Sequence, residues 1–163
     1  MKKVKLNSNE VELALNTANK RFIGNLKMGK GFSYGYQGDY RKQLADGFLG
    51  ALGEVSWSKS MNQFYNASYS DNMERYTDSD FQNNIEIRTQ EKKDYNFLLI
   101  RPGEKKGKYI LIIHDGDYQF SIMGWFPYVN DESMKHRLTN FGYKNRPAVY
   151  KVDIKELYNI NDL

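Results

Sequence analysis

The stretch TDSDFQNNIEIRTQ, residues 77–90, carries the pattern that decides how the middle of the chain folds. Within it, Ile85 and Ile87 alternate with Glu86 and Arg88. Successive side chains of a strand point to opposite faces. The alternation therefore predicts a strand that places Glu86 and Arg88 together on one face and both isoleucines on the other. Such a strand needs an apolar partner for its isoleucine face.

Length and composition predict a single domain, residues 1–163, with a core of its own. The chain is 40% hydrophobic and contains 13 Tyr and 9 Phe. A domain of this size buries roughly 68–70% of its unfolded surface, so it does not need disulfide bonds to be stable. The absence of cysteine excludes a disulfide framework and any cysteine-ligated zinc site. The net charge of +4 permits binding to nucleic acid without requiring it.

Nothing in the hydropathy pattern predicts a membrane protein. The opening residues MKKVKLNSNEVEL carry positive charges but lack the apolar core of a signal peptide. No run of about 18 apolar residues follows anywhere in the chain. We therefore expect no membrane contact and a cytoplasmic location, which is the host cytoplasm if the chain is viral.

A helix is predicted over residues 9–27. Asn9 and Glu12 have the spacing of a capping pair at its start. One apolar stripe then recurs at helical spacing. The stripe consists of Val11, Leu15, Ala18, Phe22 and Leu26.

A second helix is predicted over residues 41–60. A glycine inside a helix costs about 1 kcal/mol relative to alanine, and this helix contains three. Close approach of the helix to a sheet would explain them, and it would place Glu54, on the same small-residue face, near that sheet. The three glycines are Gly47, Gly50 and Gly53.

The segment between the two helices is rich in glycine and aromatic residues, and two interpretations of it remain open. It can be a connector pinned by its aromatic side chains. It can also contact nucleic acid, because aromatic rings stack on bases and lysines meet phosphates. In the second interpretation the contacting residues are Lys30, Tyr34, Arg41 and Lys42.

The second half of the chain predicts an α+β fold, with a mixed central sheet that contains an antiparallel meander and is flanked by helices. The apolar runs at 97–100 and 110–113 indicate strands of this meander that are covered on both faces. Asp115 and Gly116 form a hairpin-turn signal between the later strands. Residues 131–138 predict a short helix, and a last strand at 148–152 precedes a terminal helical turn. Residues 1–40 would form an N-terminal part and residues 41–163 the core.

Three carboxylates, Glu54, Asp80 and Glu86, can converge if the second helix packs on the sheet. Clustered carboxylates raise one another's pKa unless a cation intervenes, and Mg²⁺ prefers oxygen ligands. A metal-bound water could then attack a phosphodiester, with Arg88 stabilising the charge that develops on the phosphate. The alternative is a solvated antiparallel strand whose charges have no chemical role.

The order GALGE (residues 50–54), then DFQNNIEIR (residues 80–88), resembles the active-site signature of the PD-(D/E)xK, or restriction-endonuclease-like, nuclease superfamily. Glu54, Asp80 and Glu86 match its three acids. The order of the segments after residue 88 is similar to that in small phage and bacterial members of the superfamily, so the resemblance runs from about residue 44 to the C-terminus. The matching segments there are LLIRP (98–102), YILII (109–113), GW (124–125) and PAVYKV (147–152).

The resemblance implies a restriction-endonuclease-like core and a phage-encoded deoxyribonuclease that uses Mg²⁺ or Mn²⁺. The metal ligands would be Glu54, Asp80 and Glu86, with Asp78 as the alternative to Asp80. The chain departs from the signature because no proline precedes the aspartate and Arg88 occupies the lysine position. Arginine stays protonated, so it can stabilise charge but cannot serve as a general base.

Two other functions follow from the same residues. The arginine at position 88 favours a nuclease fold without catalytic activity, which would bind nucleic acid or a protein partner. The third hypothesis is a structural or host-interaction protein, for which Trp125, Phe126 and Tyr128 would form an exposed apolar patch. The sequence also leaves a homodimer open.

Overall fold

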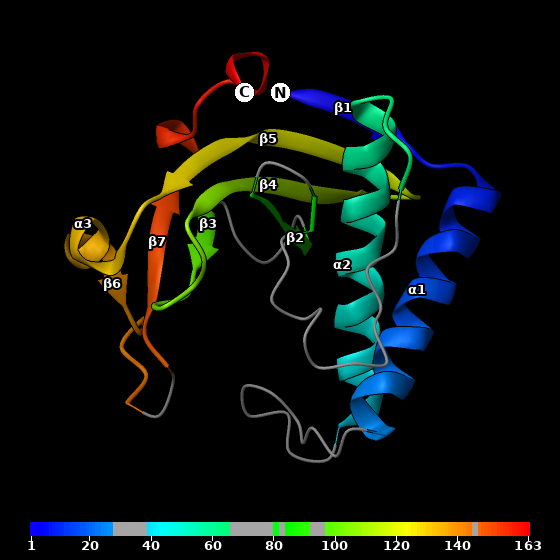
Figure 1. The fold of residues 1–163 in the computed structure, drawn as a ribbon, viewed down its shortest axis with the longest axis horizontal. Helices are drawn as coiled ribbons and strands as arrows, with labels where there is room; N and C mark the ends of the chain where they lie inside the picture. The colour runs from blue at the N-terminus through cyan, green and yellow to red at the C-terminus, as the bar shows by residue number, and fades with distance from the viewer. Residues whose placement is uncertain (28–38, 66–79, 82–83, 92–96, 145–146) are drawn as a thin grey trace.

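Two long helices near the N-terminus and a set of strands after them make up the fold (Figure 1). The computed structural model describes residues 1–27, 39–65, 80–81, 84–91, 97–144 and 147–163. The elements in chain order are β1 (Lys2–Lys5), α1 (Ser8–Lys27), α2 (Tyr40–Ser60), β2 (Ile85–Glu91), β3 (Phe97–Ile100), β4 (Gly107–Gly116), β5 (Gln119–Tyr128), α3 (Asp131–Met134), β6 (Leu138–Thr139) and β7 (Val149–Asp153), with 3-10 turns at Lys135–Arg137, Ile154–Glu156 and Ile160–Asp162. The predicted α+β class is confirmed.

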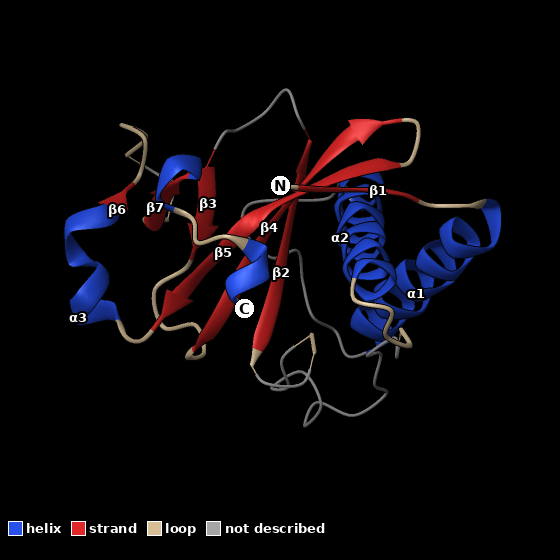
Figure 2. Cartoon of the chain, turned by 90° about the horizontal axis from the view of Figure 1, so that it is seen from above, coloured by secondary structure: helices blue, strands red, loops and turns tan. Residues whose placement is uncertain are grey.

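The elements stack in three layers. A four-stranded sheet has the order β1-β5-β4-β2, and a three-stranded sheet has the order β3-β7-β6. Figure 2 shows the four-stranded sheet between the helix pair and the three-stranded sheet. β2 pairs with β4 in parallel, while β4–β5 and β1–β5 are antiparallel, so the predicted mixed sheet is confirmed. Among the described helices, none is both long enough and apolar enough to cross a membrane.

β4 is the central strand because both of its faces are covered. Ile110 and Ile112 belong to the core beneath the helices, whereas Tyr109, Leu111 and Ile113 belong to the core between the two sheets. All five are buried, which confirms the prediction for this apolar run. The similar run in β3 is covered on one face only, since Leu98 and Ile100 are buried while Phe97 and Leu99 are half-buried.

The expected antiparallel meander is only partly present. β4 and β5 form the predicted hairpin, but β3 leaves the first sheet and pairs with β7. A parallel pair such as β2–β4 needs a crossover connection rather than a tight turn, and β3 lies within that connection. The hairpin turn also falls two residues later than predicted, at Asp117 and Tyr118, whose φ angles are 48° and 56°.

The start of the chain differs from the sequence-based prediction in two ways. β1 was not foreseen; it pairs with β5 and buries Val4. The capping box of α1 is formed by Asn7 and Glu10 rather than by Asn9 and Glu12. The Asn7 amide donates to Glu10 Oε2 at 2.7 Å, and the Glu10 amide donates to Asn7 Oδ1 at 3.0 Å. The same spacing occurs twice in the sequence, so spacing alone could not choose between them.

The buried residues of α1 are small, and the predicted stripe is covered only in part: Ala18 is buried and Val11 packs against the core beneath the helices. The buried residues are Ala14, Thr17, Ala18 and Gly24. Leu15 and Leu26, which belong to the predicted stripe, are 42% and 46% exposed. Small residues let α1 approach α2 closely, whereas large side chains on that face would hold the helices apart.

The close approach predicted from the glycines of α2 occurs at Gly53. A Cβ atom added there would lie 1.7 Å from Thr89 Oγ1 on β2, whereas Gly47 and Gly50 have no such neighbour within 4 Å. The contact sets α2 directly against β2, and the helix is buried from Ala51 to Ser58. The other two glycines have no packing role in the described residues.

Gly53→Ala should destabilise the protein by about 1–3 kcal/mol, the usual cost of overpacking a core. The matched control, Gly50→Ala, should be neutral or stabilising by up to about 1 kcal/mol, because only the helix propensity changes. Urea denaturation of both variants measures the difference. Equal effects of the two substitutions would contradict the close contact.

Candidate functional site

The two faces of β2 carry different chemistry, as the alternation of its residues predicts. Ile87 packs in the core beneath the helices. Glu86 and Arg88 pair in register with Tyr109 and Leu111, which line the core between the two sheets. Glu86 and Arg88 therefore point away from the helices. Glu54, on α2, lies on the helix side of the same strand.

Asp80 lies along the outer edge of β2, where the two faces meet. β2 is the edge strand of its sheet, and Asp80 Oδ2 accepts a hydrogen bond from the Ile87 amide at 2.7 Å. The chain reaches this position through a bridge in which the Phe81 amide donates to the Ile85 carbonyl at 3.2 Å. This geometry places Asp80 between the charges of the two faces.

The surroundings of Asp80 favour its protonated form. Burial, together with the negative charges of Glu54 and Glu86, raises its pKa from 3.8 to about 7. The hydrogen bond from Ile87 and the charge of Arg88 act in the opposite direction but do not cancel the rise. The three predicted acids therefore share one electrostatic neighbourhood. Asp78, the alternative to Asp80, lies outside the described residues.

Glu54 is buried and already engaged. Arg21 of α1 donates to both of its carboxylate oxygens, at 2.7 and 2.8 Å, and the Tyr65 hydroxyl donates to Oε2 at 2.9 Å. Burial and the nearby Glu54 charge together raise the pKa of Tyr65, which keeps its hydroxyl protonated. Although burial opposes it, contact with Glu54 also raises the pKa of Arg21. Glu54 is thus held as the acceptor of a buried charge pair.

Arg88 is engaged on the opposite face. Its Nη2 contacts Glu104 Oε2 at 2.5 Å, and its Nη1 lies 3.6 Å from Glu86 Oε2. The guanidinium also lies over the Tyr109 ring, 5.1 Å from its centroid. Burial opposes protonation of Arg88, but Glu104 and Glu86 together raise its pKa. Arg88 is therefore a fixed positive charge beside Glu86.

The described residues fit a metal held by two carboxylates better than one held by three. In this part of the chain, no group of three His, Cys, Asp or Glu side chains is arranged to hold a metal ion. Glu54 is tied to Arg21 and Tyr65, so its carboxylate oxygens already have hydrogen-bond donors. Mg²⁺ commonly takes one or two carboxylates, with water and substrate phosphate completing its shell. Asp80 and Glu86, with their mutual repulsion, suit that arrangement.

The predicted nucleic-acid contacts are only partly described. Arg41 and Lys42 are exposed in the first turn of α2, where the Lys42 amide donates to the side chain of Asp39. They lie about 20 Å from Glu54 along the helix, at 1.5 Å per residue, so the structure does not bring them to the acids. Lys30 and Tyr34 lie outside the described residues.

Three residues of the site were missed by sequence reasoning: Arg21, Tyr65 and Glu104. Arg21 contacts Glu54 across 33 positions, and no local pattern marks such a pairing. Glu104 belongs to the charged turn before β4, where its contact with Arg88 depends on how the two sheets are placed.

Comparisons with known proteins assign no function to the site. The chain matches no protein-family model, and it has no significant match among curated proteins or solved structures.

Proposed function

We propose that the protein is a metal-dependent nuclease that hydrolyses phosphodiester bonds in DNA. The observation that carries the proposal is Asp80, which accepts a hydrogen bond from the Ile87 amide of β2 and whose pKa is raised to about 7 by burial and by the charges of Glu54 and Glu86. A divalent cation would offset both the burial and the repulsion that raise this pKa. A carboxyl group kept beside other acids at such a cost is typical of a functional site.

In this proposal, Asp80 and Glu86 hold Mg²⁺ or Mn²⁺. The bound ion would supply a water of lowered pKa and would neutralise charge on the phosphate. Glu54 becomes a third ligand only if it gives up its contacts with Arg21 or Tyr65. Until then it contributes negative potential from the helix side of Asp80.

Arg88 would stabilise the negative charge that develops on the phosphate oxygens. A guanidinium has five N–H donors, so contacts with Glu104 and Glu86 do not use all of them. Arg88 stays protonated and cannot accept a proton from water. The metal would lower the pKa of the attacking water, and the released proton would pass to solvent.

The restriction-endonuclease-like core, a phage origin and a cytoplasmic location belong to the same proposal. The support is the order of the acids on their elements: Glu54 on a helix, Asp80 just before a strand, and Glu86 on that strand. The close contact of α2 with β2 is further support, because such a site requires a helix acid to lie near the strand acids.

A nucleic-acid-binding or protein-binding module without catalysis is the second candidate. It is favoured by the contacts that hold both ends of the acid cluster: Arg21 and Tyr65 on Glu54, and Glu104 on Arg88. A site kept in this arrangement would bind without cleaving. Binding to DNA that persists in Glu86→Gln, without cleavage by the wild type, would select this candidate.

The third candidate, an interaction protein with an apolar patch, has less support. Tyr128 is 3% exposed. Trp125 and Phe126 are half-buried and pack against Tyr158, with ring centroids 4.9 and 6.4 Å apart. These three side chains therefore do not form an open apolar surface in the described structure.

Cleavage of single- and double-stranded DNA in Mg²⁺ or Mn²⁺ should require Asp80 and Glu86. Asp80→Asn and Glu86→Gln should each lower the rate by at least about a hundredfold, since a catalytic metal contributes several kcal/mol. Glu132→Gln, at an exposed residue of α3, is the matched control and should cleave as the wild type does. Wild type and variants that are equally inert with both metals would end the nuclease proposal.

Without divalent cations, the free energy of unfolding should contain a contribution from Asp80 that falls as the pH rises from about 4 to about 7. The folded state keeps the Asp80 proton up to a pKa of about 7, whereas the ordinary value is 3.8. Between these values the folded state binds more protons, so raising the pH favours unfolding. Asp80→Asn should match the wild type near pH 4 and be more stable at pH 8, by roughly 1–3 kcal/mol.

Urea denaturation in EDTA at both pH values measures this difference. An Asp80→Asn effect that is the same at pH 4 and pH 8 would show that Asp80 is not held between repelling charges.

A further inference from the structure

The turn between β3 and β4, residues 101–106, carries exposed lysines that have no acidic partner among the described residues. Arg101, Lys105 and Lys106 are all exposed, and within the described structure neither lysine forms an ion pair. Three lysines elsewhere, of which Lys59 and Lys135 are exposed and Lys151 is half-buried, do form pairs with nearby acids. These pairs are Lys59–Glu10, Lys135–Glu132 and Lys151–Asp153. The turn is thus a local excess of positive charge, and we call it the basic turn.

The backbone of the basic turn is held by its neighbours. The Gly103 amide donates to both carboxylate oxygens of Asp131, at 3.0 and 3.2 Å. The Lys105 carbonyl accepts a hydrogen bond from the Tyr109 hydroxyl at 2.9 Å. One contact fixes the turn to α3 and the other to β4. The two lysine side chains therefore project from a positioned backbone.

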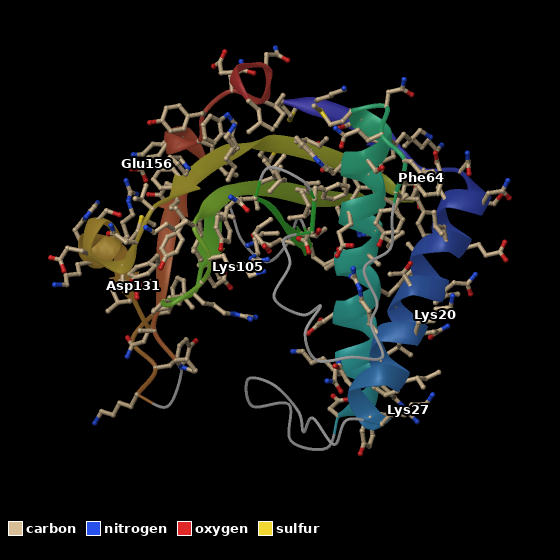
Figure 3. All side chains as sticks on the ribbon, viewed as in Figure 1. Lys20, Lys27, Phe64, Lys105, Asp131 and Glu156 are labelled. Carbon is tan, nitrogen blue, oxygen red and sulfur yellow. The ribbon has the colours of Figure 1, made fainter. Side chains whose placement is uncertain are left out.

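The basic turn lies directly beside the candidate site. Its acid, Glu104, contacts Arg88, which in turn lies next to Glu86. In Figure 3, the label of Lys105 lies below β4. Because Arg88 compensates Glu104, the charge that the turn presents to solvent is that of its cations.

This neighbourhood has a physical consequence for any polyanion. Asp80, Glu86 and Glu54 would repel a nucleic acid that approaches β2, so cations close to them are needed to hold it there. Lysine is a compact point charge suited to phosphate oxygens. Contacts of this kind position a nucleic-acid backbone without reading its sequence.

We propose that the basic turn binds the phosphodiester backbone of DNA next to the candidate site, with Lys105 and Lys106 each contacting a phosphate. The inference rests on the proposed function for its substrate and adds residues to the predicted contacts at the start of α2. Glu104 is a positioning residue, since it couples the turn to Arg88 and does not itself meet the phosphate.

The test is fluorescence anisotropy with a labelled DNA duplex, using the full chain in EDTA so that no cleavage occurs. The Lys105→Gln/Lys106→Gln double variant should bind about tenfold more weakly, and the slope of log K against log[salt] should fall by about 2, or roughly 0.9 for each lost phosphate contact. Lys135→Gln/Lys151→Gln is the matched control, because it removes the same charge from lysines that are already paired. That control should leave affinity and slope nearly unchanged. Circular dichroism confirms that each variant is folded.

Three results would overturn the inference: no duplex binding by the wild type, an unchanged slope in the Lys105/Lys106 variant, or equal losses in both double variants. The inference and the proposed function can fail separately. Cleavage by the wild type with an unchanged slope in the variant would remove the basic turn and leave the nuclease. Loss of slope in the variant without cleavage by the wild type would keep the basic turn and favour the binding module.

Discussion

The contact between Gly53 of α2 and Thr89 of β2 determines where the charged groups of the candidate site lie. A Cβ atom would not fit at this point, so glycine allows the helix to lie directly on the edge strand. Glu54 is the next residue along the helix, and the contact brings its charge close enough to raise the pKa of Asp80. A larger side chain at position 53 would separate the helix from the strand and weaken that electrostatic coupling.

β2 is an edge strand between two cores, and this position separates the charges into two sets. Arg21 and Tyr65 compensate Glu54 on the helix side, while Arg88 lies between Glu86 and Glu104 on the other. Asp80, at the edge, accepts a hydrogen bond from the Ile87 amide, and the negative charges of Glu54 and Glu86 act on it. Of the charged groups in this cluster, Asp80 is the one that a proton or a cation would stabilise most. The proposed chemistry depends on this excess of negative charge around Asp80.

The spacing of apolar and polar residues along the chain predicted the faces of β2 and the bounds of the long helices. The alternation at Ile85–Arg88 gave the two faces of β2, and both long helices begin and end within a residue or two of their predicted bounds. Of the three glycines, only Gly53 has the predicted contact, because spacing along a helix does not reveal which turn meets the sheet.

Features that depend on distant partners could not be predicted in this way. An apolar run indicates burial but not which sheet it joins, and for this reason β3 was assigned to the wrong one. Of the stripe predicted on α1, Val11 and Ala18 pack in the core, whereas Leu15 and Leu26 are exposed. The buried pair Arg21–Glu54 is the clearest case in the site, since nothing near either residue indicates the other.

The most direct test of the account is a crystal of the protein soaked in Mn²⁺ and measured at a wavelength that gives anomalous scattering from manganese. The account predicts an anomalous peak in contact with the carboxylates of Asp80 and Glu86, at the outer edge of β2. A map without a peak there, in which Asp80 still accepts its hydrogen bond from Ile87 and Glu86 still lies beside Arg88, would contradict it.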